Sequence, residues 1–289
     1  MKLLNRFSNT FKYSTSKKMI HHLNQKKMKK ILIFAAFAFI TLSSCKKDVA
    51  FEGKKMFFLK QQGRRIKTRN STHLKGPEVE VGNGYARTFI TRSHTGVPQE
   101  LGVIFTDEAL SGLPTVNTPY VLEFHHKALE STPFTHVALG WSANGHPLPG
   151  GAFITSHFDV RFFMMSLEER LAIPAPPAPG FSVLPPTGFM PANYFPDAPG
   201  GQLGVHWTDK SFVAGVPVNH TMILGSYNGA FTFVSPIVVK SELASGTSVS
   251  LPYSQPQFFA EHGYYPTQYN IYQDNKKQHY VTLSNFVWR

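Results

Sequence analysis

NHTMILGSYNGAFTFVSPIVV, at residues 219–239, is the stretch that decides the fold class of this chain. Two candidate strands, 219–226 and 231–239, stand on either side of Asn228 and Gly229. A two-residue type I′ turn needs a positive φ at both central positions, and asparagine followed by glycine adopts that conformation most readily. The stretch therefore predicts a β-hairpin.

The alternation of apolar and polar residues, interrupted by glycine and proline, continues through residues 76–289. An alternation of period two favours strands over helices. Further strands are predicted at 86–93, 100–105, 120–128, 135–142, 157–165, 204–207 and 280–288. Short helices are predicted at 107–111 and 166–173, the second beginning with a capping box of Ser166 and Glu169. These elements predict a mainly β protein, an antiparallel sandwich or barrel with one or two short helices.

Residues 76–289 are expected to form a single domain, since β folds of this length are commonly single domains. Nine prolines lie within the 27 residues from 174 to 200. Proline fixes φ and donates no backbone hydrogen bond, so most of this segment is expected to be extended or turning. A Pro-rich loop of this length inside a compact domain usually has a function, and we expect a lid or a partner surface.

A basic and apolar leader precedes the domain. Four lysines between residues 26 and 30 are followed by an apolar run at 31–42 and by Leu42-Ser43-Ser44-Cys45. The run of about 12 residues is shorter than the roughly 18 that a membrane-spanning helix needs, which favours a cleaved signal over a spanning anchor. The segment resembles the signal peptide of a bacterial lipoprotein, in which the cysteine is lipidated.

The resemblance implies that residues 1–45 form a signal peptide and that Cys45 carries a lipid anchor. Met1, Met19 and Met28 are all candidate start positions. Cys45 is the only cysteine, so its lipidation would leave no thiol for a disulfide, a nucleophile or a metal ligand. The expected location is the cell envelope, with the domain lipid-anchored on the surface of an outer or cytoplasmic membrane and membrane lipid as its partner.

The positive charge of the chain is concentrated before the domain. The whole sequence has 29 Lys and Arg against 17 Asp and Glu, a formal net charge of +12. Residues 76–289 hold only ten of the basic residues but fifteen of the acidic ones, a net charge of −5. We therefore expect no nucleic-acid partner, because phosphate contacts require a basic surface. Residues 46–75 are predicted to be a basic tether, which either contacts anionic lipid or is a solvated linker.

Seven histidines lie between residues 124 and 222. Successive side chains of a strand point to opposite faces, so His157, Asp159 and Arg161 are expected to share one face while the residues between them enter the core. Imidazole nitrogens and a carboxylate are typical ligands of mononuclear sites for divalent Zn, Mn or Fe. The candidate metal ligands are His146, His157, Asp159, His206 and His220. Lone histidines on strands are also common as structural groups, and the sequence has no zinc signature of short fixed spacing.

Two motifs in this region have a distinctive pattern. The turn at 144–150 reads NGHPLPG, and the strand at 157–163 reads HFDVRFF. They resemble an exported bacterial family, defined only as a domain of unknown function, whose members carry a Gly-His-Pro-Pro-Gly turn and a Pro-His-Phe-Asp-x-His-Phe-Tyr strand. Residues 204–209 and 219–229 are similar to later blocks of the family, and the likeness extends over residues 85–243. The resemblance implies an exported domain without an established activity.

The chain departs from the family pattern at Arg161, where the family usually has a second histidine. Arginine cannot ligate a cation and is permanently charged. Ser156 replaces the proline before the strand, and Leu148 replaces the second proline of the turn. Either the site uses its other ligands without position 161, or Arg161 turns it into an anion site or a salt bridge with Asp159.

Two classes of function are compatible with these residues. The expected one is a non-catalytic envelope or binding module, whose histidines are structural and whose loops bind an envelope partner or a small ligand. The alternative is a mononuclear metal centre of His146, His157, Asp159 and His220 that polarises a substrate or activates water, with Arg161 holding an anionic group.

Overall fold

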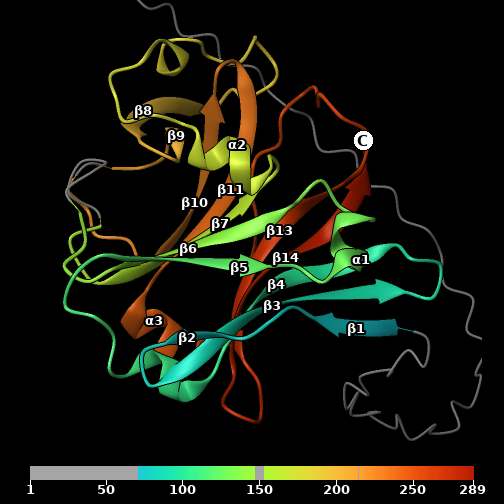
Figure 1. Ribbon diagram of the computed structural model, residues 1–289, viewed down its shortest axis with the longest axis vertical. Helices are drawn as coiled ribbons and strands as arrows, with labels where there is room; N and C mark the ends of the chain where they lie inside the picture. Colours follow the sequence, from blue (N-terminus) through green and yellow to red (C-terminus); the bar gives the residue numbers. More distant parts are fainter. Residues whose placement is uncertain (1–70, 147–152, 214) are drawn as a thin grey trace, which may run out of the picture. The chain divides into compact units, whose positions relative to one another are not determined.

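The computed structural model describes residues 71–146, 153–213 and 215–289. The predicted signal peptide at 1–45, with Cys45, and the predicted tether up to residue 70 lie outside the described residues. Within these residues the chain forms two seven-stranded antiparallel sheets (Figure 1). The predicted mainly β, antiparallel fold is confirmed, and its form is a sandwich.

Sheet A contains both the first and the last strand of the described chain. Its strands lie in the order β1, β3, β4, β14, β13, β12, and β2 pairs with β3. Their bounds are Ser71–Lys75 for β1, Val79–Val81 for β2, Gly84–Ser93 for β3, Pro98–Phe105 for β4, Val249–Pro252 for β12, Tyr264–Gln273 for β13 and His279–Trp288 for β14. The prediction of a tether through residue 75 is wrong for Ser71–Lys75, which pair with β3. They belong to the sheet because they satisfy backbone groups along the edge of β3.

Sheet B carries most of the histidine-rich region. Its strands lie in the order β5, β6, β7, β11, β10, β9, β8. Their bounds are Thr118–Glu123 for β5, His136–Ser142 for β6, His157–Phe163 for β7, Tyr194–Gly200 for β8, Gly204–Asp209 for β9, His220–Tyr227 for β10 and Ala230–Val239 for β11. β10 and β11 form the predicted hairpin, with φ of 49° at Asn228 and 81° at Gly229. Both angles are positive, as a type I′ turn requires.

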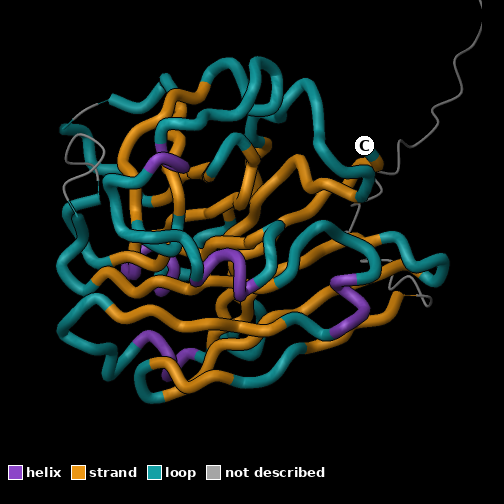
Figure 2. Tube along the Cα trace, turned by 45° about the horizontal axis from the view of Figure 1, so that its top comes forward, coloured by secondary structure: helices purple, strands orange, loops and turns teal. Residues whose placement is uncertain are grey.

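The helices are short segments in the connections between strands (Figure 2). They are the α-helices α1 His126–Leu129, α2 Leu167–Leu171 and α3 Lys240–Ala244, and the 3-10 helices η1 Asp107–Leu110 and η2 Pro179–Phe181. The predicted capping box of α2 is confirmed, because Ser166 Oγ accepts a hydrogen bond from the Glu169 backbone and the Glu169 carboxylate accepts one from the Ser166 backbone. The described residues thus contain three α-helices, whereas one or two short helices were predicted.

The strand predicted at 120–128 is wrong in its second half. β5 ends at Glu123, and α1 follows. His125 is the N-cap of this helix, since its Nδ1 accepts a hydrogen bond from the backbone N–H of Lys127 at 3.2 Å. A side-chain acceptor at this position satisfies a backbone donor that the first helical turn leaves unpaired, and this local bond favours the helix over continued strand.

The main core lies between the two sheets. Phe105 of sheet A and Phe158 of sheet B are fully buried, and their ring centroids are 5.1 Å apart. A second, smaller apolar cluster covers the outer face of sheet B. Its buried members are Ala138, Phe153, Phe163, Ile223, Phe233 and Ile237. Part of the outer face of sheet B is therefore buried as well, and some of its polar side chains are enclosed by protein.

The Pro-rich segment 174–200 is only partly a loop. Its last residues form β8, an edge strand in which Pro196 pairs with Trp207 and Pro199 with Val205, with a register shift between them. Proline is tolerated in edge strands because a missing N–H costs no ladder bond on the open side. Earlier in the segment, the carbonyl of Gly180 accepts a hydrogen bond from Asn228 at 3.0 Å. The segment thus packs against the β10–β11 turn.

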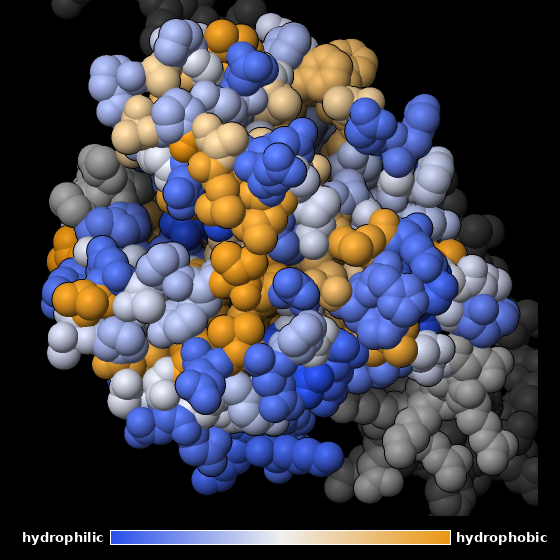
Figure 3. Space-filling view, in the orientation of Figure 1, coloured by the Kyte–Doolittle hydropathy of each residue, from blue (hydrophilic) through white to orange (hydrophobic). Residues whose placement is uncertain are grey.

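Apolar side chains also reach the surface. Figure 3 shows them gathered in a band down the centre of one face, with hydrophilic residues on both sides. The most exposed large examples are Val116, Val213 and Trp288, each with at least 60% of its area accessible. More than half of the surface of any folded protein is apolar, so such residues do not by themselves identify a partner. Enclosed polar groups are the better guide to a site.

Candidate functional site

The candidate site lies on the outer face of sheet B. His157, Asp159 and Arg161 alternate along β7, and the first two are buried. The residues between them enter the main core, namely Phe158, Val160 and Phe162. The predicted polar triplet backed by core is therefore confirmed.

His146 joins the triplet from the loop that follows β6. The backbone N–H of His146 donates to the carbonyl of Phe153 at 2.7 Å, which fixes this residue over β7. Its Nε2 lies 3.1 Å from Nε2 of His157. The same His157 atom is 3.6 Å from Oδ2 of Asp159. These three residues offer ligand atoms that all lie within 4.8 Å of one another.

A backbone contact determines which nitrogen of the neutral His157 ring carries the hydrogen. Nδ1 of His157 lies 2.8 Å from the carbonyl oxygen of Thr155. A carbonyl oxygen only accepts, so Nδ1 carries the hydrogen and the neutral ring has its lone pair on Nε2. A metal-ligating histidine usually has its other nitrogen bonded in this way. The nitrogen that faces His146 and Asp159 is thus the one suited to ligation.

The two carboxylate oxygens of Asp159 have different partners. Its Oδ1 accepts from the Arg161 guanidinium at 3.1 Å, while its Oδ2 faces His157 and lies 3.5 Å from the hydroxyl of Ser142. Burial acts to raise the pKa of Asp159, but the positive charge of Arg161 is the largest opposing influence, and that pKa is held well below its usual range. Asp159 is therefore ionised at neutral pH.

Gly140 provides the space that this ion pair occupies. It lies opposite Asp159 in the β6–β7 ladder. A Cβ atom on Gly140 would lie 2.8 Å from the Arg161 guanidinium and 3.4 Å from Oδ2 of Asp159. A glycine inside a strand often marks such a close approach. Sequence reasoning missed this residue, although the interior glycine of β6 was the available signal.

A cavity of about 320 Å³ opens beside the ion pair. Apolar and polar residues both line it. The apolar residues are Phe153, Ala198, Pro199, Leu203, Ile223 and Ile237, and the polar ones are Asn117, Ser142, His146, Asp159, Arg161, Asp197, His206, Thr208 and Ser235. This size is at the lower end of the range for small-molecule pockets. Sequence reasoning missed Asn117, Ser142, Asp197, Thr208 and Ser235.

His206 faces this cavity from β9. Its Nε2 is buried with no hydrogen-bond partner among the described residues. Burial, and next the charge of Arg161, lower the pKa of His206 to about 4, so the ring is neutral at physiological pH. The predicted ligand His206 lies at the same cavity but outside the three-residue cluster.

His220 lies on the other side of sheet B. Its Nδ1 is 3.0 Å from the hydroxyl of Tyr269 in sheet A. It shares a strand face with Met222 and Leu224, which belong to the core between the sheets. The prediction of His220 as a metal ligand is wrong, because the parity of β10 turns this side chain away from β7.

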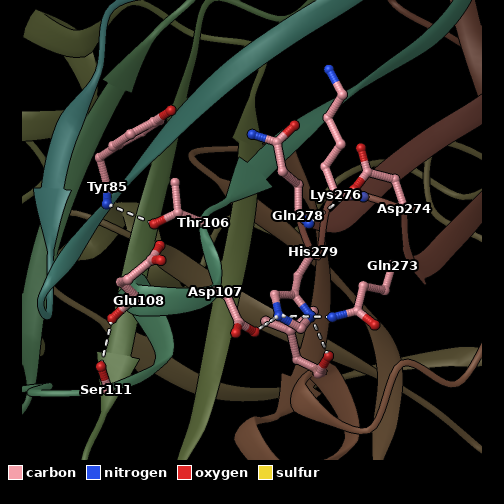
Figure 4. Close-up of polar contacts among 11 residues, drawn as sticks. Tyr85, Thr106, Asp107, Glu108, Ser111, Gln273, Asp274, Lys276, Gln278 and His279 are labelled. Atoms are coloured by element: carbon pink, nitrogen blue, oxygen red, sulfur yellow. Dashed lines mark hydrogen bonds and ion pairs between the residues drawn. The ribbon is translucent and has the colours of Figure 1, made fainter.

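Other histidines make structural contacts, which is the role that histidines on strands commonly have. His136 stacks on Phe163, with ring centroids 5.2 Å apart and planes at 2°. His279 of β14 is buried, with Nε2 2.9 Å from Asp107 and Nδ1 2.8 Å from the carbonyl of Leu243 (Figure 4). His279 thereby joins sheet A to η1 and α3. Among the described histidines, one group thus has structural contacts and another lies at the cavity.

Comparison with known proteins finds no matching family, curated protein or solved structure. The likeness of residues 85–243 to the exported family of unknown function therefore stays a prediction. In the part of the chain that the structure describes, no helix has the length and apolar character needed to cross a bilayer.

Proposed function

We propose that this domain binds one divalent metal ion through His146, His157 and Asp159. The observation that carries the proposal is the convergence of two imidazole Nε2 atoms, 3.1 Å apart, with a buried carboxylate. Two nitrogen ligands at about 2.0–2.1 Å from a zinc ion are roughly 3.3 Å apart at a tetrahedral angle, so little movement is needed. Zn, Mn and Fe are the candidate ions.

Three protein ligands would leave at least one coordination position open toward the cavity. Closed structural metal sites usually have four protein ligands, whereas sites that handle a ligand or substrate keep a free position. The bound ion would supply Lewis acidity to a group in the cavity. The proposal thus favours a ligand-binding metal centre over a module whose histidines are all structural.

Arg161 gives a specific reason to consider a metal-free site. Its guanidinium is 3.1 Å from Oδ1 of Asp159 and could stand in for the cation. Its contact is with Oδ1, however, while Oδ2 faces the two histidines. The carboxylate can therefore pair with Arg161 and ligate an ion at the same time.

Metal content after equilibrium dialysis against Zn²⁺ tests the proposal. We expect one zinc ion per full-length chain purified in detergent, and the same value for His94→Gln, a control at an exposed histidine in the β3–β4 turn. No zinc in the natural chain, together with one per chain in Arg161→His, would show that the Asp159–Arg161 salt bridge has replaced the metal site.

We further propose that Cys45 anchors the protein by a lipid in the cell envelope. The support is Leu42-Ser43-Ser44-Cys45 at the end of an apolar run that is too short to span a bilayer. Cells that express the natural chain are expected to incorporate a fatty-acid probe into it, and those that express Cys45→Ala are not. Equal labelling of the two chains would contradict the proposal.

A further inference from the structure

The cavity beside the proposed metal centre has its own binding groups, whose chemistry defines a ligand. We infer that it binds a small carboxylic acid that also carries a hydroxyl group. The inference rests on the proposed function, because the metal ion completes the charge of the site. It is drawn from Arg161, His206 and Ser235, none of which belongs to the metal cluster.

Arg161 is the group that would hold the carboxylate. It lines the cavity, and one of its terminal nitrogens bonds Asp159. A guanidinium has five N–H donors in a planar fork that matches a carboxylate, so the contact with Asp159 does not exhaust it. Gly140 leaves the other terminal nitrogen uncovered by a Cβ atom.

His206 and Ser235 would hold the hydroxyl group. Nε2 of His206 and Oγ of Ser235 are both buried at the cavity, and among the described side chains neither has a hydrogen-bond partner. Nε2 of His206 donates or accepts according to the tautomer of the ring, and a ligand hydroxyl can pair with it in either case. Buried polar groups are nearly always satisfied, which makes two unsatisfied ones at one cavity a sign of a bound partner. A ligand hydroxyl can pair with the imidazole nitrogen or with the serine hydroxyl.

The size and walls of the cavity limit the rest of the ligand. Its volume of about 320 Å³ is that of a small-molecule pocket and accommodates a carbon chain beyond the polar groups. Phe153, Leu203, Ile223 and Ile237 form an apolar wall, against which a short alkyl chain would pack. A hydroxy acid with a short aliphatic chain combines all three features.

The charge of the cavity links this ligand to the metal. Two carboxylates, Asp159 and Asp197, and one guanidinium, Arg161, give the lining a formal charge of −1. A divalent ion would change this to +1, which favours an anion. Carboxylate binding is therefore expected only in the metal-loaded protein, and each ligand should raise the affinity for the other.

The test uses the full chain loaded with Co²⁺, whose visible absorption reports on its ligands. Calorimetric titration of the Co²⁺-loaded chain with 2-hydroxybutyrate, 3-hydroxybutyrate and butyrate is expected to show binding, with at least one hydroxy acid binding more than about 10-fold tighter than butyrate. The Co²⁺-free chain is expected to bind none of them, as measured by calorimetry.

Three variants separate the contributions, and circular dichroism confirms that each one is folded. Arg161→Lys keeps the charge but loses the fork, and it should weaken all three acids by about 10-fold while Co²⁺ remains bound. His206→Leu should reduce the preference for a hydroxy acid to less than about 3-fold with butyrate binding unchanged. This variant is decisive because a hydroxyl next to a carboxylate also chelates metals by itself. His94→Gln is the matched control and should behave as the natural chain.

Other outcomes would contradict the ligand assignment or the metal site itself. If Co²⁺ binds but none of the acids does, or if the preference survives in His206→Leu, the inference is overturned and the metal site stands. If the natural chain takes up no Co²⁺, the proposed function fails, and this inference fails with it.

Discussion

Replacing His157 by asparagine is expected to lower the zinc affinity of the chain by more than about 100-fold without unfolding it. Removal of a residue that only orients a metal ligand already lowers the affinity by about 10- to 100-fold, and removal of the ligand itself should lower it further. Asparagine carries an amide nitrogen near the position of Nδ1, so it can still donate to the carbonyl of Thr155, which His157 contacts at 2.8 Å. It has no atom at the position of Nε2, which faces His146 and Asp159. Competition with a zinc-binding dye measures the affinity.

His94→Gln provides the comparison for this variant. It also removes an imidazole, but from an exposed position. Its zinc affinity should equal that of the natural chain, and both variants should keep the circular dichroism spectrum of a β protein. An affinity of His157→Asn within about 3-fold of the natural value would contradict the assignment of this residue as a ligand.

Replacing Phe158 by alanine is expected to lower the free energy of unfolding by about 3–5 kcal/mol. Phe158 is fully buried between the sheets, where its ring contacts Phe105 at 5.1 Å and Trp141 at 4.8 Å between centroids. Alanine would leave a cavity at the centre of the sandwich. Urea unfolding followed by tryptophan fluorescence measures the change.

Phe195→Ala is the matched control, because this phenylalanine in β8 is 37% exposed. Its loss should cost less than about 1 kcal/mol, since much of the ring is already in water. Equal costs for the two variants would contradict the face-to-face packing of the sheets.

Strand alternation and turn chemistry allowed much of the fold to be predicted. The β10–β11 hairpin follows from Asn228-Gly229, and β7 follows from its alternating side chains. β13, Tyr264–Gln273, was missed because its burial does not alternate, so no period of two appears in its sequence. β8 was missed because its prolines indicate a loop unless the strand is known to lie at an edge.

The site could be predicted only where residues share one strand or a neighbouring turn. His157 and Asp159 follow from strand geometry, and His146 lies on a turn that folds back over them. The place of His220 depends on which face of β10 points outward. Residues 222–226 of this strand are all buried, so the sequence carries no signal that distinguishes its two faces. The face on which Ser235 lies could not be predicted for the same reason, because residues 232–239 of β11 are all buried.

X-ray absorption spectroscopy at the zinc K-edge of the zinc-loaded full chain tests the central claim most directly. We predict one zinc ion with two imidazole ligands and at least one oxygen ligand, at about 2.0–2.2 Å. The imidazole scattering should disappear when His146 and His157 are both replaced by asparagine. Zinc surrounded by oxygen alone, or imidazole scattering that persists in the double variant, would contradict the metal centre proposed for His146, His157 and Asp159.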